Sequence, residues 1–380
     1  MEAENRSKGI IPMKKEHRIY LAGPLCFYPD GQKLWNSNKL EAEYYGFTVT
    51  MPNNNQLVRE GETVSKVEMA SRIFKNCVWG IDGVDGIIVN LETYRGSEPD
   101  GGSLYELGMA YGVGARCYAF TRDKRTVGVK YQAAKYNDDV KTAKDIFGNN
   151  LGHPELPFAV NVIGSTKIIE GSFSDALQLY RIDLIEESKK KAMRGYTETK
   201  PPLTVTLEKK DRPVVYVSTS DRDNPDAKEK YEGLRKILDK YGFDAIFPTD
   251  DAPGVEDIET DDIYEKAYNI FDRYTQHVRN CDIILLDLND YRGGFEPNSD
   301  VSFEAGYSYE LGKKQFGFMD DIGPMVDRIP NIRTETDTRD FNGMNVEDFE
   351  APLNLMFGSS VKLLDGDFEE IIRKMAEELK

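Results

Sequence analysis

An internal repeat constrains this chain more than any other feature of its sequence. The stretch "EPDGGSLYELGMAYGVG" (residues 98–114) has a near copy in "EPNSDVSFEAGYSYELG" (residues 296–312). The segments that flank the two copies also match each other, in the same order along the chain. A chain of 380 residues is long enough for two domains, each with a core of its own. The repeat therefore predicts a tandem duplication.

Each half of the chain alternates short apolar runs with segments of helical pattern. "RIYLAG" and "VVYVSTS" begin the halves as buried strands rich in β-branched and aromatic residues. In both halves there follow a helix ending at "YGF", a second strand, another helix, a third strand, the repeated stretch, a fourth strand and a charged final helix. This alternation predicts the α/β class: two flavodoxin-like or Rossmann-like doubly wound parallel sheets, arranged as a pseudo-dimer.

The same comparison sets the expected domain boundaries. We predict a polar N-terminal tail over 1–16, a first domain over 17–195 and a second domain over 213–380. The segment 196–212 is polar and contains two adjacent prolines, which is typical of a linker.

Composition excludes several classes of function. The formal net charge of −17 argues against nucleic-acid or anionic-membrane partners, which require clustered Lys and Arg. The four cysteines are widely spaced, and the start of the chain lacks the apolar core of a signal peptide, so we expect a reduced, cytoplasmic protein. With three scattered histidines and no paired cysteines, we expect no metal site and no cofactor.

Three stretches of the first half should meet where the strands of its sheet end, since ligands of open parallel sheets bind beyond the carboxyl ends of the strands. They are "YLAGP" (20–24), "PNNNQ" (52–56) and "PDGGSLYE" (99–106). Their glycines permit close approach of backbone to a ligand. Ser103 suits a helix N-cap, and Glu106, three residues later, has the spacing of its capping-box partner. That local role is the alternative to a catalytic one for Glu106.

Together, "IYLAGP", "PDGGSLYELGMA" and a later Asn in "AVNVIG" or "PLNLMFG" resemble the nucleoside 2-deoxyribosyltransferase family. Its members move 2-deoxyribose from one nucleobase to another, and close relatives hydrolyse N-glycosidic bonds. The resemblance covers nearly all of both halves. The spacing agrees as well: Tyr20 to Glu106 is 106 − 20 = 86, and Tyr216 to Glu304 is 304 − 216 = 88.

The resemblance implies roles for individual residues. Glu106 would be the nucleophile, Asp100 would contact the base, and Tyr20 would hydrogen-bond the nucleophile. Asn354 would complete the Glu106 pocket from the second half, as a neighbouring subunit does in the family, although a buried strand or turn is the alternative for its segment. The expected substrate-binding residues are Gly23, Pro24, Gln56, Gly102, Ser103 and Asn354.

The second copy departs from the family pattern. Its candidate site comprises Glu304, Tyr216, Asp300 and Asn161. "LAGP" has become "STS" there, and Asn298 stands where the first half has Asp100. In both halves a further family Asp is replaced, by Cys77 and Tyr274. We therefore expect Glu106 to serve the active site and Glu304 a weakened one.

The expected function is base exchange on 2-deoxyribonucleosides, through a covalent glycosyl-Glu intermediate and with retention. Nucleosides and free nucleobases would be the partners. Two alternatives stay open: an N-glycosidase acting on nucleosides or on 5′-monophosphates, with Ser103 and the helix N-terminus holding the phosphate, and a non-catalytic nucleotide-binding protein. Purine or pyrimidine preference, tolerance of ribose and assembly into a larger homo-oligomer are also open.

Overall fold

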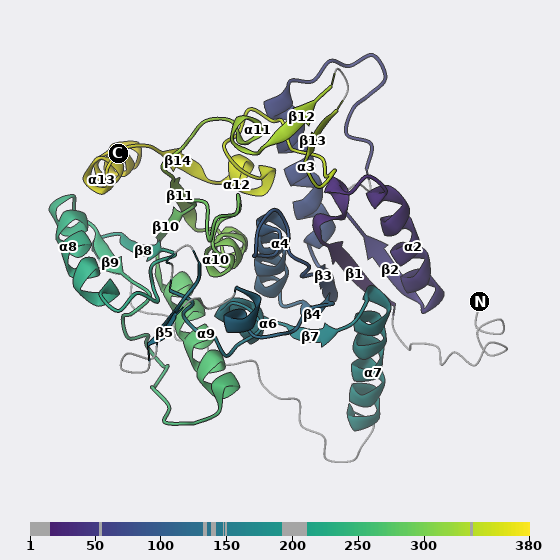
Figure 1. The fold of residues 1–380 in the computed structure, drawn as a ribbon, viewed down its shortest axis with the longest axis horizontal. Helices are drawn as coiled ribbons and strands as arrows, with labels where there is room; N and C mark the ends of the chain where they lie inside the picture. The colour runs from purple at the N-terminus through teal and green to yellow at the C-terminus, as the bar shows by residue number, and fades with distance from the viewer. Residues whose placement is uncertain are drawn as a thin grey trace.

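The structure is a computed structural model that describes residues 16–52, 55–131, 135–137, 142–146, 148, 150–191, 211–334 and 337–380. Two α/β halves lie side by side, the first coloured purple to teal and the second green to yellow (Figure 1). The predicted tail over 1–16 lies outside the described residues apart from Glu16, and the predicted linker over 196–212 apart from its last two residues. The domain boundaries therefore stay a prediction.

Each half contains a five-stranded sheet in which all paired strands are parallel, and the two sheets have equivalent strand orders. The first has the order β2-β1-β3-β4-β7, and the second β9-β8-β10-β11-β14. The strands of the first sheet are β1 (His17–Ala22), β2 (Phe47–Thr50), β3 (Gly86–Asn90), β4 (Arg116–Thr121) and β7 (Lys167–Glu170). Those of the second are β8 (Val214–Ser218), β9 (Asp244–Ile246), β10 (Ile283–Asp287), β11 (Lys314–Phe318) and β14 (Lys362–Leu364). This order is that of flavodoxin-like doubly wound sheets, as the alternation of strands and helices predicts.

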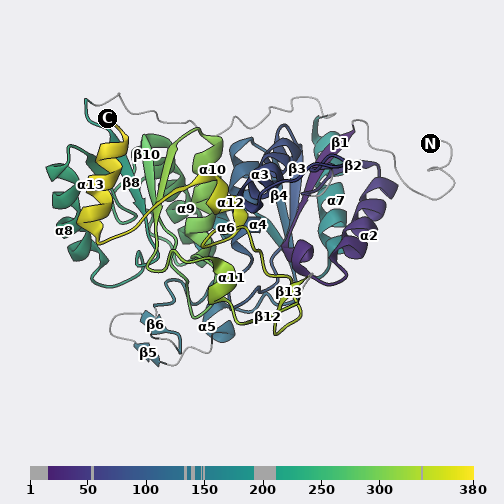
Figure 2. The ribbon, with the colours of Figure 1, turned by 90° about the horizontal axis from the view of Figure 1, so that it is seen from above.

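Helices cover both faces of each sheet. The outer faces carry α2 (Gly31–Tyr44) and α7 (Phe173–Lys191) in the first half, and α8 (Ala227–Lys240) and α13 (Phe368–Glu378) in the second (Figure 2). The inner faces carry α3 (Lys66–Ile81), α4 (Gly101–Gly112), α9 (Ile263–Asn280) and α10 (Ser299–Glu310). The inner helices of both halves share a single apolar core, so the two halves are packed into one body.

Two short helices cross from one half to the other. Helix α6 (Val160–Ser165) belongs to the first half but packs on α9 and α10 of the second, while α12 (Leu355–Ser360) of the second half packs on α3 and α4 of the first. These helices begin beside the two Asn residues that the sequence singled out, Asn161 within α6 and Asn354 as the N-cap of α12. The alternative of a strand or turn for the Asn354 segment is thus wrong: a helix follows it.

A glycine in each copy of the repeated stretch permits α4 and α10 to cross closely. A Cβ atom placed on Gly108 would lie 2.1 Å from the carbonyl oxygen of Phe303, and one on Gly306 would lie 1.8 Å from that of Tyr105. Both distances are far inside van der Waals contact. Because each glycine lies two residues after the Glu of its copy, the crossing places both glutamates on inner helices of the shared core.

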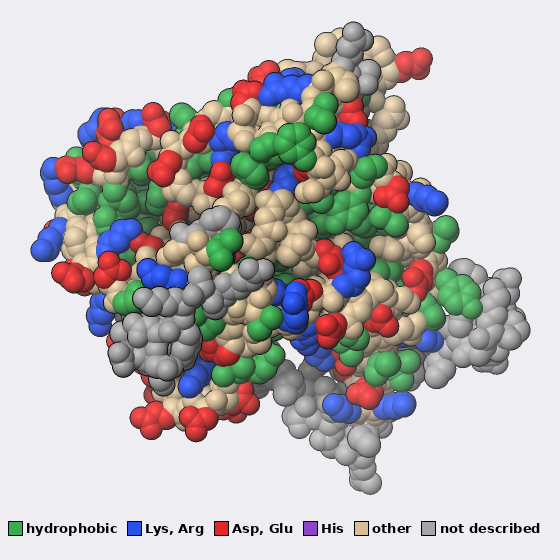
Figure 3. All heavy atoms as spheres, viewed as in Figure 1, with side chains coloured by type: hydrophobic (Ala, Val, Ile, Leu, Met, Phe, Trp, Pro, Cys, Tyr) green, Lys and Arg blue, Asp and Glu red, His purple; other side chains and the backbone are tan. Residues whose placement is uncertain are grey.

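The protein surface seen in Figure 3 carries Lys and Arg scattered among Asp and Glu. This face has no continuous basic area of the kind that binds nucleic-acid backbones. Among the described residues, no helix is both long and apolar enough to cross a membrane.

Candidate active site

Glu106 lies at the middle of α4 and is 5% exposed. The hydroxyl of Tyr20, on β1, donates to its Oε1 at 2.6 Å. Burial raises the pKa of Glu106 to about 8, the hydrogen bond from Tyr20 opposes that shift, and the negative charge of Asp100 adds to it. Hydrogen bonding to Cys77 is a further, smaller opposing effect. An acidic group is thus held inside the protein by a phenol, with no cation paired to it among the described residues.

The start of α4 is capped differently from the sequence prediction. Asp100, rather than Ser103, is the N-cap: its Oδ2 accepts from the backbone amide of Ser103 at 2.8 Å and also from the Ser103 hydroxyl. Glu296 of the second half accepts from the amide of Gly101 at 3.0 Å. Glu106 is therefore not a capping-box partner, because its carboxyl points to Tyr20 and the helix start is capped by other residues.

Beside Glu106 lies a cavity of about 310 Å³, at the edge where the strands of the first sheet end. Pockets of roughly 300 Å³ and more are large enough for small-molecule ligands. The first half contributes Gly23, Cys26, Phe27, Pro52, Ile73, Cys77, Asp100, Gly102, Ser103 and Glu106. The second half contributes Asn345, Val346, Glu347, Asp348, Phe349, Asn354, Leu355 and Met356. The site is therefore built by both halves.

The second half places Asn354 close to the start of α4. The Oδ1 atom of Asn354 caps α12 by accepting from the amide of Met356 at 2.9 Å. Gly102 is the residue that permits this approach, since a Cβ there would lie 2.7 Å from Asn354 Nδ2. Asn354 thus lines the Glu106 cavity, as the pseudo-dimer hypothesis requires geometrically.

The structure separates the predicted binding residues into two groups. Gly23, Gly102, Ser103 and Asn354 line the cavity together with Asp100 and Glu106, and Tyr20 lies directly behind Glu106. The other predicted contacts, Pro24 and Gln56, are not among the lining residues. Gln56 is exposed and donates to the carbonyl of Val58 at 3.0 Å, so its placement gives no support to a contact with a base.

Sequence reasoning missed two carboxyl groups of the cavity, those of Glu347 and Asp348. Glu347 lies seven residues before Asn354, and the position seven residues before Asn161 in the other half is Pro154. Because the repeat has no second copy of this residue, self-similarity gave no signal for it. Its acidic neighbours and apolar surroundings become evident only when the two halves are packed together.

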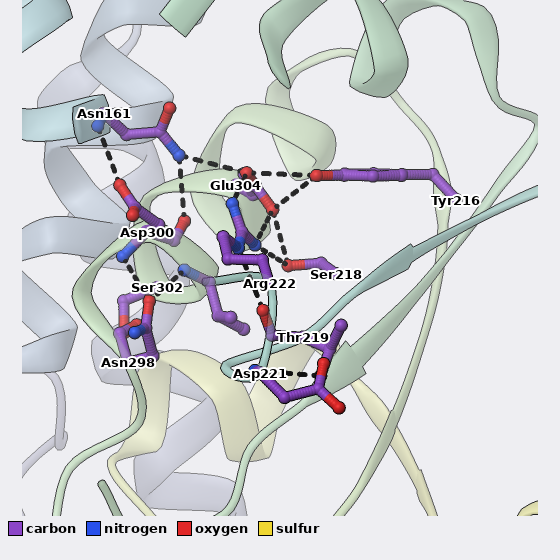
Figure 4. A network of polar contacts seen from close by, with 11 residues as sticks. Asn161, Tyr216, Ser218, Thr219, Asp221, Arg222, Asn298, Asp300, Ser302 and Glu304 are labelled. Atoms are coloured by element: carbon purple, nitrogen blue, oxygen red, sulfur yellow. Dashed lines mark hydrogen bonds and ion pairs between the residues drawn. The ribbon is translucent and has the colours of Figure 1, made fainter. Parts of the chain in front are cut away.

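The second copy of the site is closed by an arginine (Figure 4). Arg222 Nη1 and Nη2 donate to Glu304 Oε1 and Oε2 at 2.7 and 3.0 Å, with both side chains 1% exposed. The Ser218 hydroxyl donates to Oε2 at 2.5 Å, Tyr216 at 3.2 Å to Oε1, and Asn161 Nδ2 at 3.1 Å to Oε1. The carboxylate is thus satisfied by protein donors on every side.

Little space is left around this second carboxylate. A neighbouring cavity lined by Asp300 measures only about 30 Å³, and Glu304 does not line it. Asp300 instead accepts from the amide of Asn161 at 2.7 Å, and burial raises its pKa to about 6. The four residues predicted for a second site do come together, but around Arg222, with no room for a sugar.

One position distinguishes the two copies. Cys26 lies 26 − 20 = 6 residues after Tyr20, and Arg222 lies 222 − 216 = 6 residues after Tyr216. Cys26 is exposed to the open cavity, whereas the Arg222 guanidinium fills the equivalent region and lies over the Tyr274 ring at 4.6 Å. A small side chain leaves one copy open, and a large cationic one fills the other.

No group of three or more His, Cys, Asp or Glu residues in the described ranges is arranged to hold a metal ion.

Comparison with known proteins connects this geometry to a family. The family model described as nucleoside 2-deoxyribosyltransferase matches residues 19–146 and 215–356, once in each half. A search of curated proteins gave no match. Among solved structures, the chain is similar to a 2-desoxiribosyltransferase from Leishmania mexicana, with 26% identity and a TM-score of 0.33, over 43% of this chain and 97% of that one. It is also similar to a conserved protein from Enterococcus faecalis V583, with 17% identity and a TM-score of 0.29, over 44% of this chain and 99% of that one.

Proposed function

Since this chain belongs to the nucleoside 2-deoxyribosyltransferase family, we propose that its Glu106 cavity exchanges the nucleobase of 2-deoxyribonucleosides through a covalent glycosyl-Glu106 intermediate. The observation that carries the proposal is the carboxyl of Glu106 beside a ligand-sized cavity, hydrogen-bonded by Tyr20 and free of any cationic partner among the described residues. A carboxylate placed in this way can attack an anomeric carbon.

The reaction divides into two half-reactions. In the first, a Glu106 oxygen bonds to C1′, the bond between C1′ and the base nitrogen breaks, and its electron pair leaves with the base, which takes a proton from Asp100. In the second, a nitrogen of the acceptor base bonds to C1′, the bond to Glu106 breaks with its electron pair, and the proton of the acceptor returns to Asp100. Two displacements at C1′ retain the configuration, as in retaining glycosidases.

Asp100 suits the role of proton carrier in this scheme. Its Oδ1 is buried and has no hydrogen-bond partner among the described residues, while Oδ2 is held by Ser103. Burial raises the pKa of Asp100 above its usual range, although the hydrogen bonds from Ser103 act in the opposite direction. A carboxyl group with a raised pKa and one free oxygen can donate a proton to a departing base and recover it from the next.

The charges of the cavity favour nucleosides over 5′-monophosphates. Four acidic residues line it, Asp100, Glu106, Glu347 and Asp348, and none of its described lining residues is Lys, Arg or His. The N-terminus of α4, which could otherwise hold a phosphate, is already capped by the carboxyl groups of Asp100 and Glu296. A phosphate dianion would meet repulsion here and find no free donor at that helix end.

The proposal assigns one working site to each chain. Glu304 forms an ion pair with Arg222 and lines no cavity among the described residues, so we assign it a structural role.

Asn354 would hydrogen-bond the sugar from the second half. Replacing it with Ala should lower the rate of base exchange while the fold is retained; an Asn354→Ala variant with full activity would remove Asn354 from the site.

The test is mass spectrometry of the intact protein and of its proteolytic peptides after brief exposure to a 2-fluoro-2-deoxynucleoside, which slows breakdown of a glycosyl-enzyme. We expect an adduct on Glu106, and Glu304 serves as an internal control because it is in the same chain and should stay unmodified. The mechanism would be refuted if no adduct formed on Glu106 and a Glu106→Ala variant kept its full base-exchange activity.

Transfer is separated from hydrolysis by a second measurement. A deoxynucleoside is incubated with and without a different free base, and both free bases are quantified. Exchange that depends on the second base supports the transferase; equal release of the first base in both incubations would identify an N-glycosidase. A protein that binds nucleosides but shows neither reaction would be the non-catalytic alternative.

A further inference from the structure

Glu347 reaches the Glu106 cavity from the second half and is held there by two sets of contacts. The backbone amide of Leu355 donates to its Oε2 at 3.0 Å, while no described residue hydrogen-bonds its Oε1. The segment that carries it is clamped by Arg95 of the first half, whose Nε donates to Asp340 at 3.0 Å and whose Nη2 donates to the carbonyl of Asn345. One oxygen of Glu347 is therefore fixed by the protein, and the other is available to a ligand.

Asp100 is the electrostatic neighbour of both Glu106 and Glu347. Its negative charge is among the causes that raise the pKa of each of the two glutamates, although burial is the larger cause in both. Asp100 also presents an oxygen that has no partner among the described residues. Asp100, Glu106 and Glu347 all line the same cavity, so the base of a nucleoside whose sugar lies at Glu106 shares that space with Asp100 and Glu347.

Arg95 is the nearest cation to Asp100 and Glu347, but its guanidinium is hydrogen-bonded to Asp340 and Asn345 and not to either of the two carboxyl groups. Two carboxyl groups that share one cavity without a directly paired cation tend to hold one proton between them. The protonated member then donates a hydrogen bond and the ionised member accepts one. The edge of a neutral nucleobase presents the same alternation, a ring nitrogen or carbonyl next to an N–H group. The free oxygens of Asp100 and Glu347 thus match the chemistry of a base edge, and they match a sugar hydroxyl or a phosphate less well.

We propose that Glu347 is a specificity-determining residue of the Glu106 cavity, contacting the nucleobase together with Asp100. This inference rests on the proposed base exchange, because it assumes that a nucleoside occupies the cavity. It gives the second half of the chain a function beyond packing. Glu304 of this half is paired with Arg222, but Glu347 of the same half lines the Glu106 cavity and would determine which base binds there.

The experiment measures binding without chemistry. In a Glu106→Ala background, the dissociation constants of free adenine, hypoxanthine, cytosine and thymine are determined by calorimetry. Adding Glu347→Ala should weaken the binding of at least one of the four bases by about 10- to 100-fold, the loss of affinity expected when a hydrogen-bonding group of the site is removed. Adding Glu347→Gln keeps an acceptor for the Leu355 amide but fixes the other atom as a donor, so it should change the ranking of the four bases.

A matched control uses Glu350→Gln, which removes the same charge from the same segment at an exposed position outside the cavity lining. It should leave all four constants unchanged. Unchanged base affinities and ranking in both Glu347 variants would overturn the inference. If those affinities are unchanged while the 2-fluoro adduct still forms on Glu106 of the unmodified protein, only the proposed role of Glu347 is refuted. If no adduct forms and no base binds to any variant, the proposed function itself is refuted.

Discussion

Replacing Arg222 with Met tests the interpretation of the closed second site. Met fills a similar volume but removes the guanidinium that donates twice to Glu304, at 2.7 and 3.0 Å, and once to the carbonyl of Thr219 at 2.9 Å. The hydrogen bonds from the other donors to Glu304 can remain. The variant therefore leaves a carboxylate buried at 1% exposure without a counter-charge.

Breaking a buried ion pair from one side costs about 3–5 kcal/mol, mainly because the remaining charge is desolvated and unpaired. One kcal/mol lowers the melting temperature of a domain of this size by roughly 2–4 °C, so the expected loss for the second half is roughly 6–20 °C.

The assay is urea and thermal unfolding of Arg222→Met, of Arg222→Met with Glu304→Gln, and of a surface control, Arg373→Met. The double variant should recover most of the lost stability, since it removes the unpaired charge. Arg373 pairs with Glu377 at 2.7 Å on the exposed face of α13, and breaking that solvent-exposed pair should change the stability little. A loss below about 1 kcal/mol in Arg222→Met, or no recovery in the double variant, would refute the assignment of Glu304 to a structural ion pair.

Three further predictions concern the open site. Burial raises the pKa of Glu106 to about 8, so kcat/KM, measured from pH 6 to 10, should rise through pH 8 as Glu106 loses its proton and becomes the nucleophilic carboxylate. A profile that is flat around pH 8 would contradict this. Glu106→Gln should raise the free energy of unfolding in urea by about 3 kcal/mol at pH 7 and by under about 1 kcal/mol at pH 5. The reason is that a carboxyl whose pKa is raised from 4.5 to about 8 on folding costs stability only as pH rises through that interval. Equal effects at both pH values would show that the raised pKa of Glu106 is not the cause. Cys26→Arg should fill the Glu106 cavity as Arg222 fills the equivalent region of the second half, and should lower the rate of base exchange at least 1,000-fold, the order of magnitude expected for removing a nucleophile. The control variant Cys26→Ser should keep its activity. An active Cys26→Arg variant would show that this position does not decide whether a site has a cavity.

Much of the fold could be predicted from the sequence because its signals are local and occur twice. The alternation of apolar strands with helices specified both parallel sheets, and the equivalent strand orders followed from the duplication. The pairing of Tyr20 with Glu106, and of Tyr216 with Glu304, was implied by the family resemblance, and both pairs are in hydrogen-bond contact. Local pattern failed at the start of α4, where Ser103 has the right residue type for a cap but Asp100 holds the position.

What the sequence determined by itself is the architecture, since this depends on short-range pattern and on a repeat, and the family resemblance in the same sequence pointed to the two candidate carboxylates. Which copy remains open was decided only in the tertiary structure, because it depends on how much volume and charge one side chain, Cys26 or Arg222, brings to a pocket formed by distant segments. The same holds for Glu347. It lines the same cavity as Asp100 only because the second half folds over the first, and no periodicity in a linear chain encodes that placement.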